Sequence, residues 1–360
     1  MRILVAANFD VGLYKFRKEL LQEFINRGHQ VYISLPKGDL VAPLVEMGCE
    51  FIETDIDRRG TNPLTDIKLI MSYKSILKKV KPDLVITYTI KPNIYMGIAC
   101  RQSKTPYAIN ITGLGTAFQN SGTVLKLFTV LYKFACKKAN TVIFENCDNM
   151  QTFVNFCIVK NEQCLLNNGA GVNIEEYVKA PYPNDNEIRF LFIGRVMKEK
   201  GIDELFSAAK RMNDEYDNIY FDIVGPYEDD YKDITERLQA QGIITYYGYQ
   251  EDVKPFIEKC HCFVLPSWHE GMANTNLECG AMGRPIITSD INGCLEAVIN
   301  NKSGFLVQPK NSNDLYDKIK SFIYLPYEEK VQMAECSHNH IVEHFDKKLI
   351  VERTVERLKV

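Results

Sequence analysis

Two glutamates, Glu270 and Glu278, lie eight positions apart in the segment Pro266–Glu278. The apolar run Cys262–Leu265 precedes them and is typical of a buried strand, whereas the residues after Gly271 favour a helix. A strand–loop–helix corner leaves free backbone N–H groups at the helix start, where an anion binds favourably. Glu270 in the loop and Glu278 about two turns into the helix would then hydrogen-bond hydroxyls at the two ends of one elongated, phosphate-centred ligand.

A second segment carries the opposite charge. The predicted strand 188–193 leads into Gly194 and Arg195, and Lys200 and Gly201 follow before the next helix. Glycines let the backbone approach a ligand, and the two cations suit a diphosphate leaving group. A nucleotide sugar has such a diphosphate between a sugar and a ribose. The alternative is a capped surface helix with a solvated glutamate and a strand end with solvated cations.

The elements that must position these residues alternate along the chain between apolar strand-like runs and amphipathic helix-like runs. Such alternation predicts parallel sheets with helices on both faces. We expect strands at 3–7, 31–35, 51–52, 84–87, 107–111, 141–144, 188–193, 220–224, 243–247, 263–265, 285–288 and 304–307. The main helices before the break are expected at 14–27, 64–80, 93–101 and 124–138, and only helices are expected in the last fifty residues.

The alternation breaks at two turn-rich stretches, 167–171 and 180–185, which favour an interdomain connection. We therefore predict an α/β protein of two doubly wound, Rossmann-like domains, 1–170 and 171–340. A last helical segment, 341–360, is expected to pack back on the first domain. Ligands of such sheets bind at the carboxyl ends of the strands, so the cleft between the two facing halves is the expected site.

The composition is that of a globular protein, with 46% hydrophobic and 25% charged residues among 360. No run of eighteen apolar residues could span a bilayer, and the N-terminus lacks a signal-peptide layout, so we expect a cytoplasmic protein. Its eleven cysteines are scattered, which is typical of reduced thiols. Cys260, His261 and Cys262 lack a second ligand cluster, so no metal site is expected.

The charge differs between the halves: residues 1–180 hold 22 Lys and Arg against 16 Asp and Glu, and residues 181–360 hold 21 against 30. A basic N-terminal half indicates an anionic partner, such as a phosphorylated acceptor or a membrane surface. Nucleic acid is not expected, because no dense basic block interleaved with aromatics is present.

The predicted helix 124–138 is both basic and apolar. One stripe carries Lys126, Lys133 and Lys137, and the rest is surrounded by Leu125, Phe128, Leu131, Tyr132 and Phe134. Such a helix can lie in a membrane interface. It can equally be a sheet-packing helix with a solvated lysine edge.

The segments 194–201 and 270–278 together resemble the C-terminal domain of family 4 retaining glycosyltransferases, which have the GT-B fold. The segment 277–288 is similar to that family's Leu-Glu-Ala-Met-Ala-x-Gly-x-Pro-Val-Val pattern. In the N-terminal half, 89–95 and 111–118 resemble the branch that builds capsular polysaccharide and lipid-linked glycans. That branch includes bacterial N-acetylgalactosaminyl- and galactosyltransferases.

The resemblance implies roles for individual positions. Arg195 and Lys200 would bind the donor diphosphate, Glu270 would hold hydroxyls of the transferred sugar, and Glu278 would bind the ribose. The other substrate-binding positions that it implies are Gly12 in the first strand–helix loop, Asp10, Thr112, Gly113, Gly194, Gly271, Met272 and Asn274. Asp10 is a candidate general base, or else a helix cap or turn former. No metal or other cofactor is implied, because cations and helix N-termini replace it.

The expected activity is that of a retaining hexosyltransferase. It would move a hexose or N-acetylhexosamine from a nucleotide diphosphate sugar, with UDP as the expected nucleotide, to a polyprenyl-diphosphate-linked saccharide in capsule, O-antigen or glycan assembly. The enzyme would touch the inner surface of the membrane peripherally. Two alternatives stay open, a nucleotide-sugar epimerase of the same fold and a non-catalytic partner subunit of a glycosyltransferase.

Overall fold

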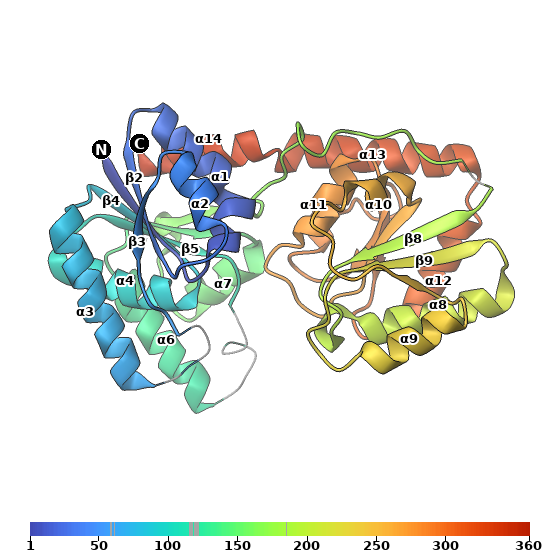
Figure 1. Cartoon of the computed structure of the whole chain (residues 1–360), viewed down its shortest axis with the longest axis horizontal. Helices are drawn as coiled ribbons and strands as arrows, with labels where there is room; N and C mark the ends of the chain where they lie inside the picture. The colour runs from blue at the N-terminus through green and yellow to red at the C-terminus, as the bar shows by residue number, and fades with distance from the viewer. Residues whose placement is uncertain (58–59, 61, 115–117, 119–121, 185) are drawn as a thin grey trace. The chain divides into compact units, whose positions relative to one another are not determined.

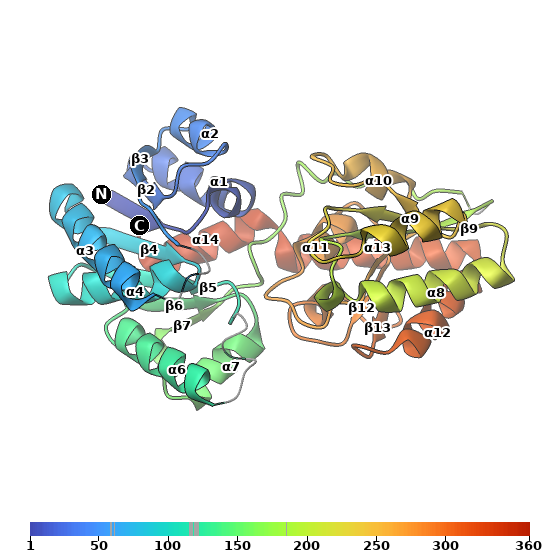
Figure 2. The ribbon, with the colours of Figure 1, turned by 60° about the horizontal axis from the view of Figure 1, so that its bottom comes forward.

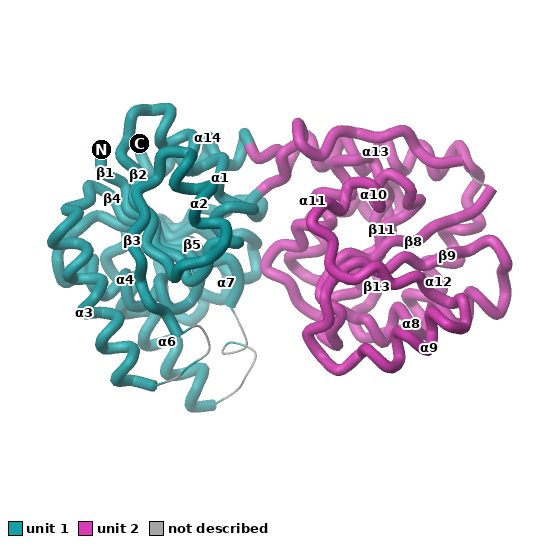
Figure 3. The backbone as a smooth tube through the Cα atoms, viewed as in Figure 1, with its two compact units in different colours: residues 1–170, 348–360 teal, residues 171–347 magenta. Residues whose placement is uncertain are grey.

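The computed structural model describes every residue except 58–59, 61, 115–117, 119–121 and 185. The chain forms two compact units (Figure 3). Unit 1 comprises Met1–Ala170 together with Lys348–Val360, and unit 2 comprises Gly171–Lys347. The sequence analysis places the corresponding changes at 171 and 341. Among the described residues, no helix is both long and apolar enough to cross a membrane.

Unit 1 is built on a parallel sheet of seven strands in the order β3-β2-β1-β4-β5-β6-β7. Every residue of β4, β5 and β6 is buried, as expected of a parallel sheet that is covered on both faces. The strands are β1 Arg2–Ala6, β2 Gln30–Leu35, β3 Glu50–Glu53, β4 Leu84–Tyr88, β5 Tyr107–Ile111, β6 Thr141–Phe144 and β7 Cys164–Leu166.

Helices cover both faces of this sheet (Figures 1 and 2). One core cluster joins the sheet to α1, α2 and α14, and includes Phe24, Leu44 and Val355. The other joins it to α3, α4, α6 and α7, and includes Tyr73 and Tyr132. The helices are α1 Asp10–Asn26, α2 Val41–Glu46, α3 Pro63–Val80, α4 Ile90–Ser103, α6 Thr123–Cys136, α7 Cys147–Asn155 and α14 Lys347–Leu358.

Unit 2 repeats the architecture on six parallel strands in the order β10-β9-β8-β11-β12-β13, with one hydrophobic core. Its strands are β8 Ile188–Ile193, β9 Ile219–Val224, β10 Thr245–Tyr246, β11 Cys262–Leu265, β12 Ile286–Ser289 and β13 Gly304–Val307. Its helices are α8 Ile202–Glu215, α9 Lys232–Ala240, α10 Lys254–Lys259, α11 Asn274–Ala281, α12 Ser312–Ile323 and α13 Tyr327–Phe345. The predicted pair of doubly wound sheets is confirmed.

Local signals explain where some helices begin and end. Asn62 caps α3 by accepting a hydrogen bond from the Leu64 N–H at 3.0 Å, and Pro63 occupies the first helical position. The helix ends at Lys81, which is left-handed with φ of 50°, just before Pro82. The predicted strands 141–144, 188–193 and 304–307 are confirmed residue for residue.

The bounds of several elements differ from the sequence prediction, and two of the differences have a clear physical reason. Helix α1 begins at Asp10 rather than near Tyr14, because the Asp10 carboxylate accepts a hydrogen bond from the Leu40 N–H and so holds the first turn in place. Strand β7 was not predicted, since its three residues are too few to show a period.

Candidate functional site

The carboxyl ends of β8 and β11 lie side by side in unit 2, because the two strands are hydrogen-bonded neighbours with Phe263 opposite Leu191. The loop that begins at Gly194 follows β8, and the loop that begins at Pro266 follows β11. Both segments singled out in the sequence therefore leave the sheet at one edge, where ligands of parallel α/β sheets bind.

Lys200 and Glu270 meet at this edge. The Lys200 Nζ forms an ion pair with the Glu270 Oε1, and the Ser267 hydroxyl donates to the same oxygen at 2.8 Å. Only 20% of the lysine side chain and 11% of the glutamate side chain are exposed. Two side chains predicted to act on one ligand are thus in direct contact. Both are largely buried, so electrostatic interactions between charges are stronger here than in water.

The backbone geometry of Gly201 brings these loops together. Its φ is +71°, and a Cβ there would lie 2.0 Å from the Pro266 carbonyl oxygen. Only glycine allows this approach. The neighbouring backbone is joined as well, since the Trp268 N–H donates to the Glu199 carbonyl at 2.9 Å. Lys200 therefore has a fixed position beside the loop that carries Glu270.

The start of α11 faces the same end of the sheet. Ala273 precedes the helix, and its methyl side chain cannot cap the first N–H groups. The Oδ1 of Asn274, the first helical residue, is buried and has no hydrogen-bond partner among the residues that the structure describes. Met272 is buried and Gly271 half-buried in the loop before it. This helix start can receive an anionic group.

Glu278 lies in the second turn of α11, closer to the start than predicted, because the helix begins at Asn274 rather than directly after Gly271. Its neighbour is Tyr177. Burial, the charge of Glu278 and a hydrogen bond to it all raise the pKa of Tyr177. The tyrosine therefore stays protonated and can hold the carboxylate in one orientation.

Arg195 has a different environment. Its guanidinium forms an ion pair with the Glu228 Oε1 at 3.4 Å, and 51% of its side chain is exposed. Gly194, before it, donates its N–H to the Val224 carbonyl at 2.9 Å. Arg195 thus follows the same strand end, but its recorded ion pair is with Glu228 rather than with Glu270.

Sequence reasoning missed Trp268 as a site residue. The Lys310 Nζ lies 4.4 Å and the Lys198 Nζ 5.8 Å from its ring centroid, and the indole N–H donates to Glu204 at 3.3 Å. His269, next in the chain, pairs with Glu199 at 3.3 Å. Trp268 is the only tryptophan in the chain and lies within the glutamate segment, which is the signal that could have identified it.

Unit 1 holds the other predicted positions. Gly12 lies in the first turn of α1, not in the loop before it as predicted. Asp10 is buried, and its Oδ2 accepts from the Leu40 N–H at 2.7 Å, so the geometry supports its role as a turn former. Thr112 and Gly113 follow β5 and are half-exposed, while Gly115 of the same sequence segment lies outside the described residues.

The Cys260–Cys262 segment is structural. The His261 Nδ1 accepts from the Arg189 N–H at 3.1 Å, and its Nε2 lies 2.7 Å from the Asn184 carbonyl oxygen. Burial raises the pKa of Cys260 to about 12. Among the described residues, no group of three or more His, Cys, Asp or Glu side chains is arranged to hold a metal ion.

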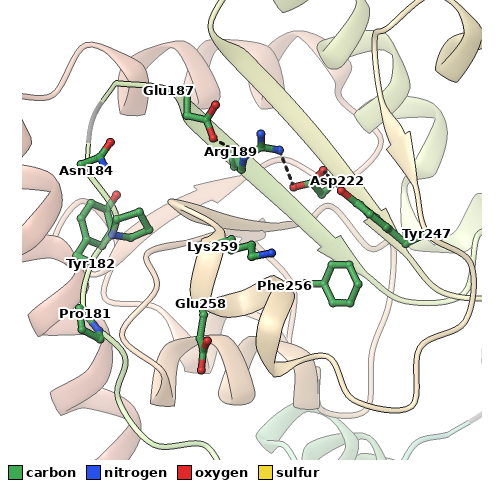
Figure 4. Close-up of a pocket in the computed structure, with 11 residues that line it drawn as sticks. Pro181, Tyr182, Asn184, Glu187, Arg189, Asp222, Tyr247, Phe256, Glu258 and Lys259 are labelled. Atoms are coloured by element: carbon green, nitrogen blue, oxygen red, sulfur yellow. Dashed lines mark hydrogen bonds and ion pairs between the residues drawn. The ribbon is translucent and has the colours of Figure 1, made fainter.

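A cavity of about 610 Å³ opens elsewhere in unit 2 (Figure 4). Arg189, the second residue of β8, lines one side and pairs with Glu187 at 2.6 Å and with Asp222 at 3.5 Å. Phe256 and Lys259 of α10 line another side. Its lining contains none of the residues predicted from the sequence, so the candidate site is the strand-end region and not this cavity.

Comparison with known proteins places both halves of the chain among glycosyltransferases. Residues 173–340 match the family described as Glycosyl transferases group 1, and residues 2–146 match Glycosyl transferase 4-like. A Campylobacter jejuni relative is an N,N'-diacetylbacillosaminyl-diphospho-undecaprenol alpha-1,3-N-acetylgalactosaminyltransferase. It is 26% identical, over 89% of this chain and 88% of its own. An Escherichia coli UDP-Gal:alpha-D-GlcNAc-diphosphoundecaprenol alpha-1,3-galactosyltransferase is 28% identical, over 84% and 80%.

Solved structures share the fold. A glycosyltransferase from Rickettsia africae has a TM-score of 0.83 at 20% identity, covering 99% of this chain and 97% of its own. An Anabaena protein solved with UDP and glucose has a TM-score of 0.81 at 18% identity, covering 100% and 99%. At these identities the likeness shows the two-domain GT-B fold alone.

Proposed function

We propose which transfer this chain performs from the premise that it belongs to the glycosyltransferases. Its N-terminal half matches the Glycosyl transferase 4-like family and its C-terminal half matches Glycosyl transferases group 1. It moves a hexose or N-acetylhexosamine from a nucleotide diphosphate sugar to a saccharide carried on polyprenyl diphosphate. The observation that carries the proposal is the contact of Lys200 with Glu270 beside the start of α11.

The residues at this edge match the parts of such a donor. When the bond between the anomeric carbon and the diphosphate breaks, negative charge develops on the leaving group. In the proposed reaction, Lys200, Arg195 and the first N–H groups of α11 stabilise this charge. Glu270 binds hydroxyls of the transferred sugar, and Glu278 binds the ribose. The acceptor hydroxyl forms the new bond to the anomeric carbon and releases its proton.

The relatives support the substrate classes. The Campylobacter and Escherichia coli proteins are both named for acceptors on undecaprenyl diphosphate, and the second also for a UDP-linked donor. Both are named for alpha-1,3 linkages, which agrees with retention if the donor is an α-linked UDP sugar. The proposed acceptor is amphiphilic, so the proposed place of action is the inner surface of the membrane.

Metal is not part of the proposed reaction, because Lys200, Arg195 and a helix start supply the positive potential that a metal ion would otherwise supply. The matching measurement is turnover in the presence of a chelator, which we expect to equal turnover without it.

The experiment that tests the function measures product rather than nucleotide release alone. The purified protein is incubated with a panel of nucleotide sugars and a short-chain prenyl-diphosphate saccharide, and the glycosylated acceptor is detected by mass spectrometry. We expect one donor to be used, and Glu270→Gln to lower kcat by roughly 10²- to 10³-fold, since it removes a charge from a preorganised site.

The control is Glu258→Gln, an exposed glutamate of α10 in the same unit, which should leave kcat unchanged. Conversion of the donor sugar without acceptor would indicate an epimerase instead. Inactivity of both wild type and Glu270→Gln with every donor would indicate a non-catalytic subunit, and equal activity of the two would exclude the proposed role of Glu270.

A further inference from the structure

The outward face of α6 is apolar. Leu127, Val130 and Phe134 are exposed there, with 62% of Val130 accessible. Of the apolar residues that the sequence analysis named on this helix, Phe134 is exposed, whereas Phe128 and Leu131 pack against the core of unit 1. The helix therefore buries one apolar side against the sheet and presents a second one to solvent.

Helix α3 presents a similar stripe. Leu64, Ile67 and Met71, spaced three and four residues apart, are all more than half exposed. This spacing puts the three side chains on one side of a helix. The opposite side of α3 holds the buried Leu69 and Tyr73, so the exposed stripe points away from the sheet.

The two stripes lie on one side of unit 1. Helix α4 packs against both α3 and α6 on the same face of the sheet (Figures 1 and 2). Its contact with α6 is tight, since a Cβ on Gly97 would lie 3.2 Å from the Ala135 Cβ. We call the outward faces of α3 and α6 the α3–α6 surface.

Lysines accompany the apolar side chains, and acids do not. The only carboxylate within α3 and α6 is Asp66. It is turned inward, since its Oδ1 pairs with the Lys91 Nζ at 2.9 Å and its Oδ2 accepts from the Tyr95 hydroxyl at 2.5 Å. The exposed lysines of the two helices are Lys68, Lys74, Lys78, Lys79, Lys126 and Lys133.

We propose that the α3–α6 surface rests on an anionic lipid bilayer, with its apolar side chains in the boundary between headgroups and acyl chains. The lysines then lie at the lipid phosphates. Mixed apolar and basic residues on solvent-facing helices suit such an interface. A protein partner fits less well, because lysine is depleted in protein interfaces. The inference rests on the proposed function in one respect: the proposed acceptor lies in the membrane, so contact with the membrane would bring the enzyme to its acceptor.

The apolar contribution is tested with two valines of matched exposure. Val130 is 62% exposed on α6, and Val178 is 61% exposed in unit 2. Flotation measures binding to vesicles of phosphatidylcholine with and without phosphatidylglycerol. We expect Val130→Asn to weaken binding to the anionic vesicles several-fold and Val178→Asn to leave it unchanged. Equal effects of the two substitutions would overturn the proposal.

The charge contribution is tested with two pairs of exposed lysines. Lys126→Glu with Lys133→Glu replaces two positive charges of the α3–α6 surface by two negative ones, and Lys210→Glu with Lys232→Glu makes the same change in unit 2. At about 1 kcal/mol per lysine, the first pair should lower binding to anionic vesicles by at least 30-fold. The second pair should lower it much less. Equal losses of vesicle binding in the two double variants would contradict the proposal, and so would wild-type binding that does not depend on phosphatidylglycerol.

Transfer assays separate this proposal from the proposed function. The Lys126→Glu, Lys133→Glu variant should retain turnover on a short-chain acceptor in solution and lose it on a long-chain acceptor in vesicles. If wild type transfers sugar in solution but never binds vesicles, the surface proposal fails and the function stands. If wild type binds anionic vesicles but transfers no sugar to either acceptor, the function fails and the surface proposal stands.

Discussion

At the scale of single residues, Lys200 and Glu270 form an ion pair with each other, and the same two side chains are the ones proposed to bind the donor. Ser267 adds a hydrogen bond to the Glu270 carboxylate. A donor that offers hydroxyls to Glu270 and phosphate oxygens to Lys200 would exchange these contacts for equivalent ones. Neither charge is then left buried without a partner, which would be costly.

Glu278 offers a test of donor binding that is separate from catalysis. We expect Glu278→Gln to raise the KM for the nucleotide sugar by about 10- to 100-fold with little change in kcat, because a hydrogen bond to a charged group is lost equally from ground and transition states. Steady-state kinetics measures both constants. Glu258→Gln is the control, and an unchanged KM for Glu278→Gln would exclude ribose binding by this carboxylate.

The cysteines allow a pH-dependent test of burial. Cys147 and Cys157 are exposed, whereas burial raises the pKa of Cys49 to about 11 and of Cys260 to about 12. A raised pKa keeps a thiol protonated and unreactive, so raising the pH from 7 to 9 should speed alkylation of Cys147 and Cys157 but not of Cys49 and Cys260. Peptide mass spectrometry reads each site. Rapid labelling of Cys260 in the native protein would contradict its buried position.

At the scale of elements, the joint between η2 (Lys198–Lys200) and the loop after β11 depends on one backbone position. Gly201→Ala should lower the free energy of unfolding by about 1–3 kcal/mol and reduce transfer, because its new methyl group would displace the Pro266 carbonyl and with it Lys200. Urea unfolding and the transfer assay measure the two effects.

A second glycine serves as a control that distinguishes backbone strain at positive φ from a steric clash of the new methyl group. Gly242 also has a positive φ, of 74°, but nothing lies within 4 Å of its Cβ position. Gly242→Ala should therefore cost about 1 kcal/mol of stability and leave transfer unchanged. Equal losses of activity in the two variants would show that the close approach at Gly201 does not position the site.

At the scale of the whole molecule, α14 returns the end of the chain to unit 1. Val355 is fully buried in the cluster beneath α1 and α2, and the neighbouring Thr354 accepts a hydrogen bond from the Asn167 side chain at 2.9 Å. The C-terminal residues are therefore part of the core of the N-terminal unit. Their deletion would remove an internal packing surface, not a tail.

Val355→Ala tests whether this packing is local to unit 1. It should lower stability by about 1–2.5 kcal/mol, from the lost methyl groups and the cavity that they leave. Hydrogen exchange followed by mass spectrometry should show faster exchange in peptides of α1 and β1, and unchanged exchange in β8 and β11. The exposed Glu352→Ala is the control. Faster exchange throughout unit 2 would mean that the two units unfold together.

Much of the fold of this protein can be predicted from local sequence patterns. Alternating apolar and amphipathic runs predict both parallel sheets, because strands and helices must each bury an apolar face. The segments that hold Lys200 and Glu270 were identifiable because glycine, charge and a strand end coincide in a short stretch. Gly12 and Asp10 were misplaced in a loop because Gly12 is a weak helix former, and the contact that holds the turn comes from Leu40, thirty residues away.

Tertiary structure decided which of these residues touch. Lys200 and Glu270 are seventy positions apart and meet because β8 and β11 are neighbours in the sheet, an order that no periodicity encodes. The same is true of Arg195 with Glu228 and of Glu278 with Tyr177. Likewise, the sequence of α6 contains apolar residues all round, and only packing against α4 and the sheet selects Leu127, Val130 and Phe134 as the ones left facing solvent. Local sequence sets what each segment can form, whereas strand order and helix packing set what each side chain meets, because those depend on contacts between residues far apart in the chain.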